Sequence, residues 1–250
     1  MKLPDTVSIA FETNGRGYIG FIAEFPGAFI RGRTEKEAIS KVNSEVNLYL
    51  KWLGIEQKHE YKIQIVQRHR SSLMIEDADN EILLKVDEEM IGEEELRSLL
   101  DLVYFSGETF LQLYANAKLK DWIDESRIRK TFYGDNPKTI EEIFTHVKGC
   151  QFYYLSRMMI SEKIEGDFMT SRKFCLEKLE PLYRKNNNSL KLEIDNELWT
   201  LKKVLRRFIW HDRIHGKAMT RILEKQKQLG LINEYNDPFC FMEATSYNIA

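Results

Sequence analysis

The feature that most limits the fold of this chain is its longest helical segment, residues 197–230. The segment reads ELWTLKKVLRRFIWHDRIHGKAMTRILEKQKQLG and ends at Gly230, a residue common just after a helix. Its apolar positions recur at helical spacing and define one face, formed by Leu201, Val204, Leu205, Phe208, Ala218, Met219 and Ile222. We expect its charged residues to fall largely outside that face, namely Lys202, Arg206, Arg213 and Lys217.

Three further segments have helical spacing, at residues 93–117, 136–160 and 167–185, the last interrupted near Pro181. Four helices over about 135 residues predict an all-α four-helix bundle. We assign this bundle to residues 93–235 and a C-terminal tail to residues 236–250.

Residues 1–70 have a different residue pattern, which predicts a small α+β domain. Short runs rich in β-branched and aromatic residues predict three to four strands in an antiparallel sheet, at residues 7–12, 18–25, 27–32 and 60–67. An amphipathic helix begins at Thr34, where Glu37 completes a capping box, and ends at Gly54. Residues 71–92 are acidic and mixed. We interpret them as a connection, with a short strand near residues 82–86.

Composition restricts the classes of function. The net charge of −2 provides no general attraction to nucleic acid or to an anionic membrane. No run approaches the roughly 18 apolar residues that a membrane-spanning helix needs. Three widely spaced cysteines, Cys150, Cys175 and Cys240, argue against a disulfide framework and favour a reducing, cytoplasmic location. We expect neither a nucleic-acid partner nor a membrane.

The residues most suggestive of chemistry are His211 and His215. Positions four apart on a helix share a face, so the two imidazoles can chelate one divalent ion. A third histidine, His146, lies in the second helical segment. Three nitrogens from two helices would leave coordination positions open, as in catalytic metal sites. The alternative is that these histidines are ordinary members of a packed helical core.

The two halves of this histidine set occur in recognisable patterns. The stretches TIEEIFTHVKGCQFYYLSRM and LWTLKKVLRRFIWHDRIHGKAM resemble the DinB-like (damage-inducible) superfamily of four-helix metal-binding bundles. The positions that carry the resemblance are Thr139, Glu142 and His146 in the first, and Trp199, Thr200, Val204, Leu205, His211 and His215 in the second. The resemblance covers about residues 93–230. It implies a divalent metal on the three histidines. Imidazole ligands suit zinc, nickel, copper and iron alike, and zinc or nickel is our first choice.

The N-terminal domain has a resemblance of its own, to the HicB-like antitoxin fold. Residues 5–68 are similar through a glycine-rich strand, an E-x-P-G turn and a G-x-T-x-x-E-A helix start, carried by Tyr18, Glu24, Pro26, Gly27, Gly32, Thr34, Glu37 and Ala38. In such antitoxins a DNA-binding module follows, whereas here the helical segments take that place. The resemblance therefore implies a small ligand-binding or dimerising module.

Proteins that resemble the DinB-like group include thiol-dependent transferases and isomerases that use low-molecular-weight bacterial thiols. We therefore expect a metal-dependent enzyme, a thiol-linked transferase or hydrolase, and the resemblance also implies a homodimer. Arg207, one turn before His211, could hold a substrate carboxylate or be structural. Cys150, one turn after His146, could be a fourth ligand, a reactive thiol or a buried structural cysteine. No catalytic residue is assigned. The alternative function is a non-enzymatic, stress-related or regulatory binding protein in which the HicB-like domain is the interaction module.

Overall fold

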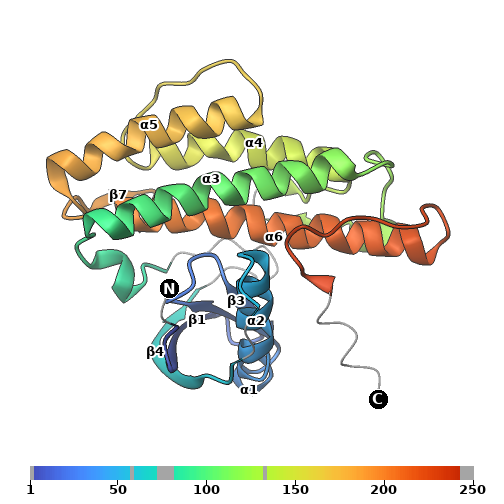
Figure 1. Ribbon diagram of the computed structural model, residues 1–250, viewed down its shortest axis with the longest axis horizontal. Helices are drawn as coiled ribbons and strands as arrows, with labels where there is room; N and C mark the ends of the chain where they lie inside the picture. The colour runs from blue at the N-terminus through green and yellow to red at the C-terminus, as the bar shows by residue number, and fades with distance from the viewer. Residues whose placement is uncertain (1–2, 57–58, 72–81, 132–133, 243–250) are drawn as a thin grey trace.

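The computed structural model describes residues 3–56, 59–71, 82–131 and 134–242. The N-terminal part is a four-stranded sheet with the strand order β3-β2-β1-β4 (Figure 1). The strands are β1 (Thr6–Thr13), β2 (Tyr18–Ile22), β3 (Phe29–Gly32) and β4 (Lys62–Arg70). All four lie at the predicted places along the chain.

The sheet is mixed, so the prediction of an antiparallel sheet is wrong for one strand. β2 pairs antiparallel with both β1 and β3, but β4 pairs parallel with β1. The reason is the connection before β4, which runs through α1 (Glu35–Ile39) and α2 (Val42–Trp52). A helical crossover returns the chain in the direction of the preceding strand, and β3 already runs parallel to β1.

The single helix predicted from Thr34 to Gly54 is two helices that meet at Ser40 and Lys41. Its predicted start is confirmed, because the Thr34 hydroxyl accepts a hydrogen bond from the Glu37 amide at 3.1 Å. The Glu37 carboxylate reaches back to the amide of Arg33 at 2.8 Å.

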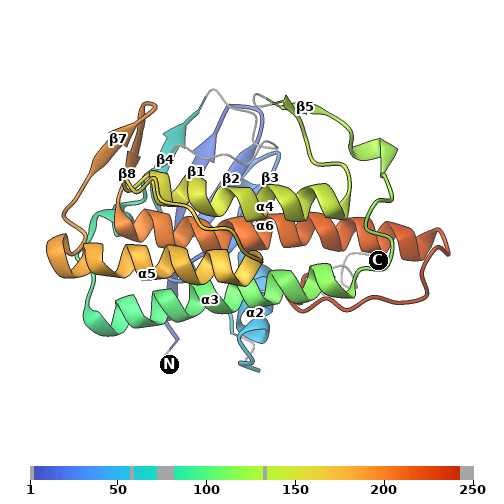
Figure 2. The ribbon, with the colours of Figure 1, turned by 90° about the horizontal axis from the view of Figure 1, so that it is seen from above.

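Four long helices follow, and they run alongside one another in both views (Figures 1 and 2). They are α3 (Glu93–Asn116), α4 (Ile140–Ser156), α5 (Phe168–Asn186) and α6 (Leu201–Gln228). The shorter elements in the described residues are the 3-10 turns η2 (Lys85–Glu88) and η3 (Glu125–Arg127) and the strand pairs β5 (Lys130–Thr131) with β6 (Gly134–Asp135) and β7 (Leu192–Ile194) with β8 (Glu197–Trp199). The chain is therefore an α+β protein, with a mixed sheet followed mostly by helices.

Helix α6 lies between the other long helices and the N-terminal part (Figure 1). Gly27 packs so closely on α6 that a side chain there would overlap Ile209. Arg213 of α6 makes an ion pair of 2.8 Å with Glu45 of α2. Trp52 of α2 donates a hydrogen bond of 3.1 Å to Thr109 of α3. One hydrophobic core consequently extends from the sheet through all four long helices.

This central position corrects the expectation for the charged residues of α6. Lys202, Arg206 and Arg213 are buried, and Lys217 is half-buried. They do lie outside the apolar stripe, but the N-terminal part, the connection and the first turn of α3 cover these positions. Buried cations require partners, and each of these four has a carboxylate within 4 Å.

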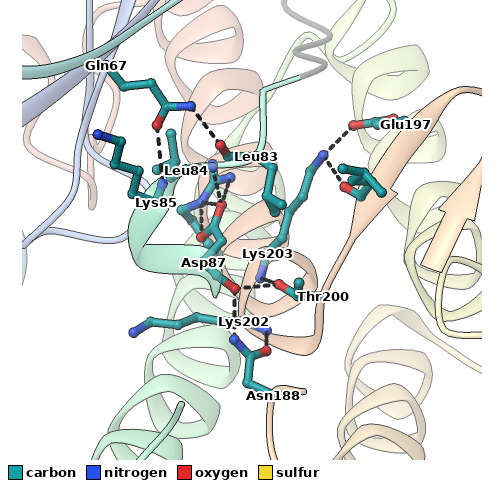
Figure 3. Close-up of polar contacts among 12 residues, drawn as sticks. Gln67, Leu83, Leu84, Lys85, Asp87, Asn188, Glu197, Thr200, Lys202 and Lys203 are labelled. Atoms are coloured by element: carbon teal, nitrogen blue, oxygen red, sulfur yellow. Dashed lines mark hydrogen bonds and ion pairs between the residues drawn. The ribbon is translucent and has the colours of Figure 1, made fainter. Parts of the chain in front are cut away.

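The predicted strand at residues 82–86 is also wrong, because the chain turns there into η2. The Asp87 carboxylate accepts a hydrogen bond from the Leu84 amide at 3.0 Å, which closes the turn. The same carboxylate pairs with Arg206, while the Asp87 carbonyl accepts bonds of 2.7 Å from Thr200 and from Asn188 (Figure 3). This part of the connection is thereby fastened to the start of α6. Residues 72–81 of the connection lie outside the described residues.

The segment predicted as a C-terminal tail is described as far as Met242. Within it, Phe239 and Phe241 are buried and stack on each other. Phe239 also contacts the ring of Trp52, and the guanidinium of Arg213 lies 5.1 Å from the ring of Phe241. These residues pack where α2 meets α6.

Candidate metal centre

Two helices carry the candidate ligands, and a threonine caps each of them. Thr139 accepts a hydrogen bond of 3.0 Å from the Glu142 amide at the start of α4. Thr200 accepts one of 3.1 Å from the Lys203 amide at the start of α6. The two threonines therefore stabilise helix N-termini, which fixes where the following turns and their histidines lie.

The three predicted histidines lie together between α4 and α6. The Nε2 atoms of His146 and His211 are 3.3 Å apart. The centre of the His215 ring is 4.8 Å from that of His146 and 4.4 Å from that of His211. The site thus combines residues that are 65 positions apart in the sequence.

Cys150 belongs to the same cluster. Its Sγ lies 3.7 Å from Nε2 and 3.9 Å from Nδ1 of His146, one turn earlier on α4. One potential ligand atom from each of His146, Cys150 and His211 lies within 4.8 Å of the others. These three side chains are close enough together to be compatible with a divalent ion.

The cluster is buried on one side only. His211 is buried, whereas His146, Cys150 and His215 are half-buried. Burial lowers the pKa of His211 well below its usual value, and the nearby His215, His146, Arg207 and Arg172 lower it further. A neutral imidazole keeps the lone pair that a metal ion requires.

Arg207 lies on the same face of α6, one turn before His211. It is buried among aromatic rings, and its guanidinium carbon lies 4.8 Å from the centre of the Trp210 ring and 5.6 Å from those of Tyr154 and Trp199. Tyr154 in turn meets the His211 ring edge-on at 5.5 Å. Arg207 therefore packs beside the cluster, and the Tyr154 ring lies next to both the Arg207 guanidinium and the His211 imidazole.

Sequence reasoning missed a buried polar network directly behind the cluster. Arg172 of α5 binds the Asp212 carboxylate with two bonds of 2.8 and 2.9 Å, and its Nε donates to Gln151 at 2.6 Å. Ser106 of α3 also donates to Asp212. The network includes one side chain from each of the four long helices. Its sequence signals were Asp212, in the turn between the two histidines, and Gln151, next to Cys150.

Adjacent residues of an α-helix point about 100° apart, because the helix has 3.6 residues per turn. The Asp212 carboxylate accordingly faces Arg172 instead of the imidazole of His211. Asp212 therefore anchors the turn of α6 that carries His211 and is not placed as its hydrogen-bond partner.

Comparison of the chain with protein-family models, with curated proteins and with solved structures finds no significant match. Among the described residues, no helix is both long enough and apolar enough to cross a membrane.

Proposed function

We propose that this protein binds a divalent metal ion, zinc or nickel, between α4 and α6. The observation that carries the proposal is the 3.3 Å separation of the Nε2 atoms of His146 and His211. Two nitrogens bound at about 2.05 Å to a tetrahedral ion lie about 3.3 Å apart. The two imidazoles, which can share a hydrogen bond when no ion is bound, already have the spacing that a shared ion requires. His215, whose ring adjoins both, would supply the third nitrogen.

We further propose that the four long helices form a DinB-like four-helix bundle and that the N-terminal part is HicB-like. The spacing of the histidines on α4 and α6 and the capping threonines Thr139 and Thr200 support the first assignment. The E-x-P-G turn at residues 24–27 and the capped helix at Thr34 support the second.

The reaction that the cluster supports best is thiol-dependent transfer or hydrolysis. When bound, a divalent ion would lower the pKa of a thiol or of water and so supply a nucleophile. The residues of the chain would hold the ion and exclude water on the buried side, where Tyr154 packs on His211. The half-buried side of His146 and His215 would admit a small molecule.

A non-enzymatic, regulatory role is the second candidate, and one observation favours it. The HicB-like part is docked on α6 through Arg213, which lies between His211 and His215 and pairs with Glu45. A partner bound to the N-terminal part could therefore affect the turn of α6 that holds the metal. In either role we propose a homodimer, which sedimentation would test.

Titration with zinc and with nickel tests the proposal. We expect one equivalent of metal to bind to the wild type. His146→Ala and His211→Ala should each weaken metal affinity at least about tenfold, because loss of a hydrogen-bond partner of a ligand already lowers affinity about 10–100-fold. His59→Ala is the matched control, since His59 packs on Tyr61 in the N-terminal part and should leave binding unchanged. Equal binding by all four proteins would refute the site.

A second assay separates the two roles. The metal-loaded protein is incubated with a low-molecular-weight thiol and an electrophile, and thioether formation is followed. Turnover that disappears in His211→Ala supports the enzyme. Metal binding without turnover, across a panel of thiols, supports the regulatory role.

A further inference from the structure

We propose that the thiolate of Cys150 is itself a ligand of the metal ion, so that the centre has three imidazoles and one sulfur. This inference deepens the proposed function and rests on it. Three histidines alone would leave the fourth coordination position of the ion open, whereas Cys150 would occupy that position.

The separations between atoms support a sulfur ligand. A tetrahedral ion with bonds of about 2.05 Å to nitrogen and about 2.3 Å to sulfur places these two atoms about 3.6 Å apart. The Sγ of Cys150 lies 3.7 Å from Nε2 of His146, the same nitrogen that lies 3.3 Å from Nε2 of His211. Because Sγ also lies 3.9 Å from Nδ1 of that ring, the thiol is within reach of the ion, and a rotation of the thiol or the imidazole away from Nδ1 would complete the coordination.

The arrangement on the helices gives an independent reason. His146 and Cys150 are four residues apart on α4, as His211 and His215 are on α6. Each pair occupies one face of its helix, one turn apart. The contacts between His146 and both α6 histidines show that the two faces meet. The two pairs bring potential ligand atoms of His146, Cys150 and His211 within 4.8 Å of one another, and the ring of His215 adjoins both other histidines.

The environment of Cys175 contrasts with that of Cys150. Cys175 is completely buried, its Sγ lies 3.7 Å from the Gln151 carbonyl, and burial raises its pKa to about 12, which suits a structural thiol. Cys150 is half-buried beside imidazoles. A thiolate among the donors favours zinc and other thiophilic ions over magnesium, calcium or manganese. If four side chains bind the ion, Cys150 must dissociate from it before an external thiol can bind at the fourth coordination position.

Cobalt substitution tests the assignment in the full-length protein. Co²⁺ bound to a thiolate shows a sulfur-to-metal charge-transfer band in the near ultraviolet, and imidazole ligands alone do not produce it. We expect the band in the wild type and its loss in Cys150→Ser and Cys150→Ala, with affinity at least about tenfold weaker. The matched control is Cys240→Ser, which should retain the band. Circular dichroism of each variant confirms that it is folded.

A measurement without substitutions complements the spectra. Alkylation of the wild-type protein with iodoacetamide, followed by peptide mass spectrometry, should show that zinc protects Cys150 and leaves Cys240 unchanged.

The outcomes separate the two proposals. Stoichiometric cobalt binding without the band, or a band that persists in folded Cys150→Ser, would overturn the sulfur ligand and leave the three-histidine site standing. Unchanged alkylation of Cys150 in the zinc-loaded protein would overturn it as well. Failure of the wild type to bind cobalt or zinc at all would overturn the metal site itself and the sulfur ligand with it.

Discussion

Replacement of Arg172 by leucine removes the cation of the buried network behind the metal site. The two partners are sealed from water, because the Arg172 side chain is 1% exposed and that of Asp212 is 0% exposed. Leucine leaves the Asp212 carboxylate buried with only the Ser106 hydroxyl as a donor in this network. It also removes the donors to Gln151 and to the Val103 carbonyl.

The expected loss of stability follows from this burial. Removal of one partner of a buried ion pair costs about 3–5 kcal/mol, because it leaves an uncompensated charge. This is a large share of the roughly 5–15 kcal/mol by which a folded protein is stable. Replacement of both Arg172 and Asp212 by leucine removes both charges, so the double variant should lose less than either single variant.

The assay is urea denaturation of the wild type, Arg172→Leu, Asp212→Leu and the double variant, analysed as a double-mutant cycle. The matched control on the same helix is Arg184→Leu, whose partner is Glu180 and whose side chain is 71% exposed. It should change stability by less than about 1 kcal/mol. A loss below about 1 kcal/mol for Arg172→Leu, or additive losses in the double variant, would refute the reasoning.

Three further predictions follow from single features of the structure. Gly27→Ala should destabilise the protein by more than about 2 kcal/mol, because Gly27 has a φ of +88° and an added Cβ would lie 2.5 Å from Ile209. Gly54→Ala is the control: Gly54 has a φ of +74° but open space around it, so the substitution should cost only about 1–2 kcal/mol of backbone strain. Chemical denaturation of both variants measures the difference. Burial lowers the pKa of Lys203 to about 8, so below pH 8 the charged side chain destabilises the folded protein, and this penalty disappears as the pH rises towards the unfolded pKa of about 10.4. Across this range the stability of the wild type should rise by up to about 3 kcal/mol relative to that of Lys203→Met. Parallel curves of stability against pH for the two proteins would contradict the assignment. Thr139→Ala should cost about 1 kcal/mol through loss of the α4 cap, measured by thermal unfolding, and no change would count against a capping role.

The elements of the fold were predictable where a local pattern determines them. Apolar residues at helical spacing located α3, α4 and α6, and the pattern at residues 167–185 located α5 in spite of Pro181. The direction of β4 was not predictable, since alternation identifies a strand but not the strand with which it pairs. The burial of Arg206 and Arg213 was not predictable either. It depends on tertiary packing against a second face of α6, which the residue pattern of a single helix does not specify.

The candidate site was predictable to a similar degree. Spacing placed His211 and His215 on one face, and His146 in the second helical segment was predicted as the third nitrogen, a choice that the resemblance shares. Cys150 has the same i, i+4 signal relative to His146, but spacing alone could not distinguish a ligand from a core cysteine. The network of Arg172 and Asp212 joins residues 40 positions apart, so the positions of Asp212 and Gln151 beside the ligands were its only local signals and neither identified Arg172 as the partner.

The measurement that tests the central claim most directly is elemental analysis of the full-length protein, purified without a His-tag or chelator. The double variant His211→Ala, His215→Ala is analysed beside it. The account predicts about one divalent ion per chain in the wild type, zinc or nickel, and its loss in the variant. A wild type that holds no divalent ion, even after reloading with zinc or nickel, would contradict the account and leave the histidines as packing residues of two helices.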